Sequence, residues 1–233
     1  MSIVAIIPAR SGSKRIPKKN IKEFNGKPII AYSIESAINS KVFDRVIVST
    51  DCEEISKTAK AYGADAPFLR PKNLSNDYAE TIPVIAHAID WISNNYENVD
   101  ICCCIYPTAP LLDSNTIVDS FNYFIETRPS GFLFSATKYS YPIQRSFRLN
   151  ESGFVKMLEP ENYHKRSQDL ANTYHDAGQF YWGFAQSFLS GKILFSEDSR
   201  IFEINNIKSQ DIDNLDDWNL AKIKHKHLQN KIK

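Results

Sequence analysis

Short apolar runs alternate along the chain with longer segments in which apolar residues recur every three or four positions. The runs are typical of buried strands and cover residues 4–7, 45–49, 66–69, 101–105 and 131–136. The periodic segments predict helices over residues 29–39, 53–62, 80–94 and 115–126. Strands that alternate with helices of this length indicate βαβ units with right-handed crossovers. The pattern therefore predicts an α/β fold with a doubly wound, mostly parallel sheet.

The alternation stops at residue 139. Residues 139–173 are rich in Tyr, Pro, Asn, Glu, Arg and Lys. They show neither the apolar runs of strands nor the three- to four-residue period of helices. A structureless loop of this length is unusual inside a compact domain, so we expect a protruding arm or small β-element that contacts another subunit. Strands over 179–185 and 201–204 and a helix over 214–228 follow. We interpret residues 1–233 as one domain with an inserted arm at 139–173.

Composition describes an ordinary soluble globular protein, with 42% hydrophobic and 24% charged residues. The N-terminus lacks the pattern of a secretory signal, and no run approaches the ~18 apolar residues of a membrane span. We therefore expect a cytoplasmic protein with neither a membrane nor a nucleic-acid partner. Cys102, Cys103 and Cys104 are consecutive in an apolar run. Because neighbouring strand residues point to opposite faces, this spacing fits burial and no zinc pattern.

A basic loop follows the first strand after Pro8. Seven basic residues lie between positions 9 and 27 against one acid, Glu23: Arg10, Lys14, Arg15, Lys18, Lys19, Lys22 and Lys27. Since the whole chain has a net charge of only +1, this positive charge is local. Backbone N–H groups around Gly12 and the neighbouring cations suit a triphosphate. The alternative is a solvated turn, because the loop has the spacing of neither a P-loop nor a dinucleotide motif.

An acidic segment near the other end of the chain offers metal ligands. Asp211 and Asp213 are two positions apart, so on an extended backbone both carboxylates point to the same side. Mg²⁺ prefers oxygen ligands and usually takes one or two carboxylates together with substrate phosphates. Asp216 and Asp217 are better explained by a helix start, where acidic side chains favour the positive end of the helix dipole.

The basic string from Arg10 to Asn20, taken with the D-x-D motif beside Asp217-Trp218, resembles the CMP-sugar synthetases. These cytidylyltransferases activate sialic acids and related nonulosonic acids. The resemblance implies a Rossmann-like nucleotidyltransferase that binds Mg²⁺ through Asp211 and Asp213 and forms a homodimer through the 139–173 insertion. Its implied nucleotide-binding residues are Arg10, Ser13, Lys14, Lys19, Asn20, Arg70 and Thr81.

The sugar side departs from the common family pattern. Tyr106-Pro-Thr-Ala-Pro-Leu resembles the family's Q-P-T-S-P-L loop, with Tyr106 in place of the glutamine that touches the acyl sugar. The sugar-binding residues that the resemblance implies are Tyr106, Gln144, Arg166, Gln179 and Tyr181. Arg166 has two readings, an active-site cation or a surface arginine of the arm. At these sugar-side positions the sequence resembles the enzymes that act on pseudaminic acid more than those that act on N-acetylneuraminate.

The implied reaction is attack of the anomeric hydroxyl of the sugar acid on the α-phosphate of CTP, with release of pyrophosphate. The product would serve surface glycan or flagellin glycosylation. The resemblance implies catalytic roles for Lys19, Arg166, Asp211 and Asp213. Two alternatives stay open: CMP activation of N-acetylneuraminate, legionaminate or 3-deoxy-manno-octulosonate, and a non-catalytic nucleotide- or sugar-binding module. A binding module would not need the paired aspartates.

Overall fold

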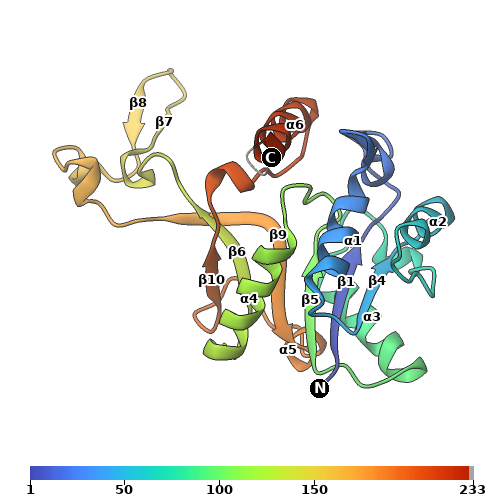
Figure 1. Ribbon diagram of the computed structural model, residues 1–233. Coiled ribbons are helices and arrows are strands. Elements are labelled where there is room, and N and C mark those ends of the chain that lie inside the picture. Colours follow the sequence, from blue (N-terminus) through green and yellow to red (C-terminus); the bar gives the residue numbers. More distant parts are fainter. Residues whose placement is uncertain (231–233) are drawn as a thin grey trace.

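A six-stranded sheet forms the centre of the computed structural model, which describes residues 1–230 (Figure 1). Across the sheet the strands follow the order β10-β6-β9-β5-β1-β4. Their bounds are β1 (Ile3–Pro8), β4 (Arg45–Ser49), β5 (Ile101–Ile105), β6 (Leu133–Lys138), β9 (Tyr174–Phe184) and β10 (Arg200–Glu203).

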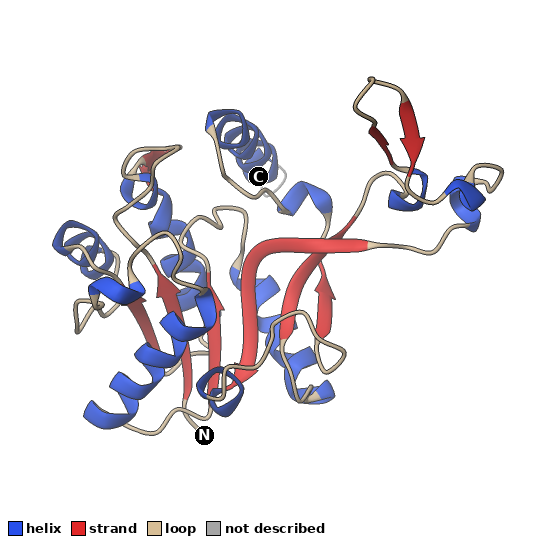
Figure 2. Ribbon diagram, turned by 180° about the vertical axis from the view of Figure 1, so that it is seen from behind, coloured by secondary structure: helices blue, strands red, loops and turns tan. Residues whose placement is uncertain are grey.

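Most neighbouring strands in this sheet are parallel. β1 pairs in parallel with both β4 and β5, and β10 pairs in parallel with β6. β9 is the exception, because it runs antiparallel between β5 and β6. It is the strand that returns to the sheet after the arm, and Figure 2 shows it curving from the sheet toward that arm. The predicted mostly parallel α/β fold is confirmed.

Helices cover both faces of the sheet. Their bounds are α1 (Ile29–Ser40), α2 (Glu53–Ala61), α3 (Thr81–Asn95), α4 (Ser114–Thr127), α5 (Ala185–Leu189) and α6 (Leu215–Asn230). Apolar side chains of α1, α2 and α4 pack on one face of the sheet, and those of α3 and α5 pack on the other. Cys103 belongs to the first cluster, whereas Cys102 and Cys104 belong to the second. All three are buried, as the alternation of strand side chains predicts.

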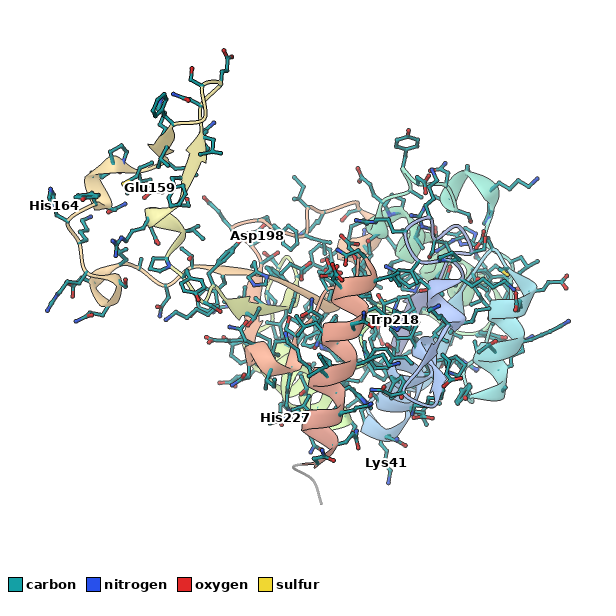
Figure 3. All side chains as sticks on the ribbon, turned by 90° about the horizontal axis from the view of Figure 1, so that it is seen from above. Lys41, Glu159, His164, Asp198, Trp218 and His227 are labelled. Atoms are coloured by element: carbon teal, nitrogen blue, oxygen red, sulfur yellow. The ribbon has the colours of Figure 1, made fainter. Side chains whose placement is uncertain are left out.

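A third, smaller cluster places the last helix over the basic loop. Ile16 of the loop packs with Ile212 and Trp218, together with Phe24 of a short hairpin formed by β2 (Glu23–Phe24) and β3 (Lys27–Pro28). Figure 3 shows Trp218 between α6 and the rest of the body. This packing brings the two motifs that are farthest apart in the sequence into one region. Within residues 1–230, no helix combines the length and the apolar character needed to cross a membrane.

Residues 139–173 project from the body as an arm (Figure 1). The hydrogen bond from the Tyr139 N–H to the Thr173 carbonyl, 3.0 Å long, joins the two ends of the segment. A hairpin of β7 (Phe147–Leu149) and β8 (Val155–Met157) lies within it. Figure 3 shows Glu159 and His164 on the arm, well away from Trp218.

The structure departs from the expected elements at residues 66–69, at the start of β9 and at α5, and it adds the β2–β3 hairpin. The predicted strand at 66–69 is wrong: around these residues only two isolated bridges form, Ile47 with Asp65 and Thr50 with Leu69. β9 begins at Tyr174, five residues earlier than expected, because the strand extends into the base of the arm. The five-residue helix α5 was not expected, since one and a half turns are too short for a helical period to show in the sequence.

Candidate active site

The basic loop forms one wall of a pocket with a volume of about 530 Å³, which is within the range of small-molecule sites. The loop leaves the carboxyl end of β1, and residues 106–108 leave the same end of the neighbouring parallel strand β5. Ligands of open α/β sheets bind outside these strand ends. The predicted residues that line the pocket are Arg10, Ser13, Lys14, Lys19, Asn20, Arg70, Thr81, Tyr106 and Asp213.

The loop is fixed to the strand by a buried side chain. Asn20 is 5% exposed, and its Nδ2 donates a 2.8 Å hydrogen bond to the carbonyl of Arg10. Lys18, two positions earlier, has a φ of 52° in the left-handed region and precedes the short helical turn Lys19–Ile21. The Asn20 hydrogen bond therefore fixes the conformation of the loop. Arg10, Lys14 and Lys19 line the pocket.

Asp77 neutralises the two outer cations of the loop. Its carboxylate lies 2.7 Å from Arg10 Nη1 and also forms an ion pair with Lys14. Hydrogen bonds from Lys14 and Arg10 lower the pKa of Asp77. These side chains are all more than one-third exposed, so solvent screens both ion pairs. An anion that binds in the pocket would therefore compete with Asp77 for both cations.

Arg70 is a buried cation in the pocket wall. Its residue exposure is 4%, and its Nε donates a 3.3 Å hydrogen bond to Ser75 Oγ. Burial lowers the pKa of Arg70, an effect that the Asp51 carboxylate opposes. Arg70 forms no ion pair with the residues that the structure describes. A desolvated guanidinium that faces a cavity suits a ligand rich in hydrogen-bond acceptors.

The D-x-D motif, Asp211-Ile212-Asp213, contacts Lys19. Ile212 is buried in the third cluster, so the aspartates on either side of it point the other way. Lys19 Nζ donates a 2.6 Å hydrogen bond to the Ile212 carbonyl, and Arg15 Nη2 lies 2.7 Å from Asp213 Oδ1. Asp217 accepts hydrogen bonds from the N–H groups of Asp213 and Asn214, in the helix-start role expected for it.

The two aspartates influence each other. Partial desolvation by neighbouring protein atoms and the nearby Asp213 charge raise the pKa of Asp211, although the residue remains exposed at the surface. Burial lowers the pKa of Lys19, and the charges of Asp213 and Asp211 partly offset this effect. Two neighbouring carboxylates whose charges repel are suited to a divalent cation. No group of three or more His, Cys, Asp or Glu side chains able to hold a metal occurs within residues 1–230. The motif thus offers two carboxylates and leaves other coordination positions for phosphate and water, as Mg²⁺ sites in nucleotide enzymes do.

A second cavity adjoins the motif. It has a volume of about 410 Å³, and its lining includes Asp211, His175, Thr137 and Lys224. Asp213 lines both this cavity and the larger pocket. The D-x-D motif therefore stands at the junction of two spaces, with the loop cations on one side.

The residues predicted for the sugar side do not gather in one place. Tyr106 lines the pocket, and its hydroxyl lies 3.0 Å from Thr81 Oγ1. Tyr181 and Gln179 are buried behind the wall: the Tyr181 hydroxyl donates to Asp176, and the Gln179 amide donates to the Lys208 carbonyl.

The two predicted residues of the arm bond within the arm. Gln144 Nε2 donates to the Ala171 carbonyl at 3.0 Å. Arg166 forms two hydrogen bonds with Asp169, of 2.7 and 3.1 Å. Neither residue lines the pocket.

Asp77 and Arg15 line the pocket, although neither was predicted as a site residue. Asp77 ends the segment Arg70-Pro-Lys-Asn-Leu-Ser-Asn-Asp. This segment resembles an R-P-x-x-L-x-x-D stretch of the CMP-sugar synthetases, which was the available signal for Asp77. No local pattern indicated that it pairs with Arg10, because the two residues are 67 positions apart.

Comparison with known proteins agrees with this geometry. Residues 4–206 match the family described as cytidylyltransferase. The chain is 47% identical over 226 residues to the pseudaminic acid cytidylyltransferase of Campylobacter jejuni subsp. jejuni serotype O:23/36 (strain 81-176), and the match covers 97% of each chain. It is 33% identical to the N-acylneuraminate cytidylyltransferase of Escherichia coli O18:K1:H7 (strain RS218 / NMEC), covering 94% of this chain and 51% of the relative.

The fold also matches that of a solved enzyme. The structure of CMP:2-keto-3-deoxy-manno-octonic acid synthetase complexed with CTP superimposes with a TM-score of 0.69, covering 99% of this chain and 100% of that one. At 17% sequence identity, this likeness concerns the fold alone. The family match over most of the chain and the extended identity with curated relatives show that the protein belongs to the cytidylyltransferase family.

Proposed function

We propose that this cytidylyltransferase joins CMP from CTP to the anomeric hydroxyl of pseudaminic acid and releases pyrophosphate. The observation that carries the choice of sugar is the 47% identity, over 97% of both chains, with the pseudaminic acid cytidylyltransferase of Campylobacter jejuni. The cationic pocket beside two carboxylates supports the nucleotide half of the reaction independently of that likeness.

The pocket residues divide between the parts of CTP. Arg10, Lys14 and Lys19 would bind the β- and γ-phosphates and stabilise the charge of the departing pyrophosphate. Arg70 and Thr81, which line the same pocket, would contact the nucleoside. Negative charge grows on the phosphate oxygens during nucleotidyl transfer, so positioned cations lower the barrier more than they stabilise the bound substrate.

Asp211 and Asp213 would hold Mg²⁺. When bound, the ion would neutralise charge on the phosphate oxygens. The chain itself fixes these ligands: Lys19 holds the backbone between them through the Ile212 carbonyl, and Asp217 holds the N–H of Asp213. Because Asp213 lies at the junction of the two cavities, this arrangement would place the reacting phosphate where a second substrate can approach.

A substrate panel tests the proposal. Purified protein is incubated with CTP, Mg²⁺ and one sugar acid at a time, and pyrophosphate release is measured for pseudaminic acid, N-acetylneuraminate, legionaminate and 3-deoxy-manno-octulosonate. We expect the highest kcat/KM with pseudaminic acid. A higher value with another acid would show that the sugar is wrong while nucleotidyl transfer is right. Failure to release pyrophosphate with any of them would favour a non-catalytic binding module.

Replacing Tyr106 by glutamine should reduce the preference for pseudaminic acid over N-acetylneuraminate. The phenol offers a flat apolar face suited to a deoxy, methyl-bearing sugar, and its hydroxyl already has a partner in Thr81. Glutamine removes that face and leaves a polar group to be satisfied, which costs about 1–3 kcal/mol. We expect kcat/KM for pseudaminic acid to fall about fivefold to a hundredfold, with a smaller loss for N-acetylneuraminate.

The control for this substitution is Tyr106→Phe, which keeps the ring and loses only the hydroxyl. It should retain most of the preference. An unchanged ratio of the two kcat/KM values in Tyr106→Gln would show that Tyr106 does not select the sugar.

We further propose that the arm pairs two copies of the chain. Its large apolar side chains are unusually exposed for a soluble protein: Tyr139, Tyr141, Ile143, Phe147, Leu149, Phe154, Val155, Leu158 and Tyr163. Two-fold homodimers are the most common soluble oligomers. Since Arg166 does not line the pocket of its own chain, pairing would also give it a route to the pocket of the partner.

Light scattering at micromolar concentration should therefore report the mass of two chains. The double variant Phe147→Lys/Phe154→Lys should shift the mass toward one chain, because it places charges in the buried part of the interface. Ile223→Lys on α6 is the control, since Ile223 is similarly exposed but lies outside the arm. A fully active wild-type protein with the mass of one chain would contradict the proposal.

A further inference from the structure

β9 contains a large bulge behind the pocket wall. Tyr181 pairs with Phe134 of β6, but the next pair joins Asp176 to Ala136. Residues 177–180 of β9 therefore lie opposite the single residue Ser135. Ser135 Oγ accepts the N–H groups of Gln179 and Phe180 at 3.2 and 3.3 Å. Bulges next to active sites commonly redirect a side chain.

Asp176 joins the two ends of this bulge. One carboxylate oxygen accepts the N–H of Gly178 at 2.9 Å, where the chain has a φ of +61°. The other accepts the hydroxyl of Tyr181. Asp176 is partly buried and forms no ion pair with any residue in the range 1–230. One carboxylate oxygen of Asp176 thus binds the backbone of the bulge at Gly178, and the other binds the hydroxyl of Tyr181.

Tyr181 transmits this contact to the pocket. It is 1% exposed, and its ring centroid lies 5.3 Å from that of Tyr106. A phenol has one proton, and that of Tyr181 is directed at Asp176, which fixes the rotation of the hydroxyl. Tyr106 in turn has its hydroxyl 3.0 Å from Thr81 Oγ1. A continuous series of contacts therefore links Asp176, through Tyr181 and Tyr106, to the first turn of α3.

We propose that Asp176 is a positioning residue for the sugar acceptor. It holds Tyr181 in place and thereby fixes the face of Tyr106 against which the sugar packs. The inference rests on the proposed function, since it assigns Tyr106 to the sugar side. The rival explanation is that Asp176 serves the metal site, because its charge contributes to the raised pKa of Asp211. A role at the metal site predicts a changed Mg²⁺ dependence in Asp176 variants, whereas a role on the sugar side does not.

The test compares Asp176→Asn with Tyr181→Phe and with the double variant. Asparagine keeps the size of the side chain but replaces one acceptor oxygen by a donor, so it cannot accept from both Gly178 and Tyr181. We expect KM for the sugar acid to rise about tenfold in each single variant. KM for CTP and the Mg²⁺ dependence should stay within about twofold. The double variant should be no worse than either single one, because both remove the same contact.

Asp119→Asn is the control, because Asp119 is exposed on α4 and the charge change is the same. All variants are assayed with the nonulosonic acid that the wild-type protein converts fastest. The inference would be overturned if KM rose in parallel for both substrates and Tm fell. A changed Mg²⁺ requirement, or effects of the two single variants that add in the double variant, would also overturn it. So would an unchanged KM for the sugar acid. A wild-type protein that converts no nonulosonic acid would contradict the proposed function, and the inference with it.

Discussion

Replacing Asp213 by asparagine should abolish turnover while the protein stays folded. The substitution keeps the shape of the side chain but removes its charge from the junction of the two cavities. The backbone N–H of residue 213 still donates to Asp217, so the start of α6 is preserved. Arg15 loses its carboxylate partner, and the proposed Mg²⁺ site loses one of its two protein ligands. A bound metal contributes several kcal/mol to stabilising transition-state charge, and about 4 kcal/mol corresponds to roughly a thousandfold in rate.

The measurement is pyrophosphate release at saturating CTP, sugar acid and Mg²⁺, with Tm recorded in parallel. Asp216→Asn is the matched control, because Asp216 is an exposed acid three positions away in the first turn of α6. It should retain near-normal turnover. If Asp213→Asn also remained near-normal at saturating Mg²⁺, the metal assignment would be wrong.

Much of the fold was predictable because its signals are local. The apolar runs at 45–49 and 101–105 coincide with β4 and β5, since strands buried on both faces appear as short continuous apolar segments. The burial of the three cysteines on alternating faces followed from the geometry of a strand. The D-x-D motif was also readable, because the buried Ile212 between two aspartates is an alternation of two positions.

What the sequence could not show depends on contacts between distant segments. Asp77 meets Arg10 and Lys14 only after the sheet has formed. The bulge in β9 arises because four residues lie opposite one across two strands, and nothing in β9 alone indicates that pairing. Tyr181 and Gln179 were assigned to the sugar side by resemblance, yet they are buried behind the wall. Their influence on a substrate would have to pass through the residues in front of them.

The pocket also has an arrangement of charges that the sequence does not show. Asp77 pairs with Arg10 and Lys14, and Asp213 pairs with Arg15. Lys19 instead donates to a backbone carbonyl, and burial lowers its pKa. A triphosphate must displace Asp77 before it can use Arg10 fully, whereas Lys19 forms no ion pair within residues 1–230 that the triphosphate would have to break. The cations of the loop should therefore contribute unequally to CTP binding.

Lys19→Ala should consequently weaken CTP binding more than Arg10→Ala. Loss of a charge-assisted hydrogen bond costs about 1.5–3 kcal/mol, or roughly ten- to over a hundredfold in Kd. We expect the upper part of this range for Lys19, which also supports the Ile212 carbonyl between the two aspartates, and the lower part for Arg10. Calorimetry with CTP and Mg²⁺ measures both, and Lys22→Ala is the control for lost charge, because Lys22 is exposed outside the pocket lining. Equal losses of CTP affinity in the two variants would refute the unequal roles. Unchanged affinity in both would show that the basic loop is a solvated turn that does not bind the triphosphate.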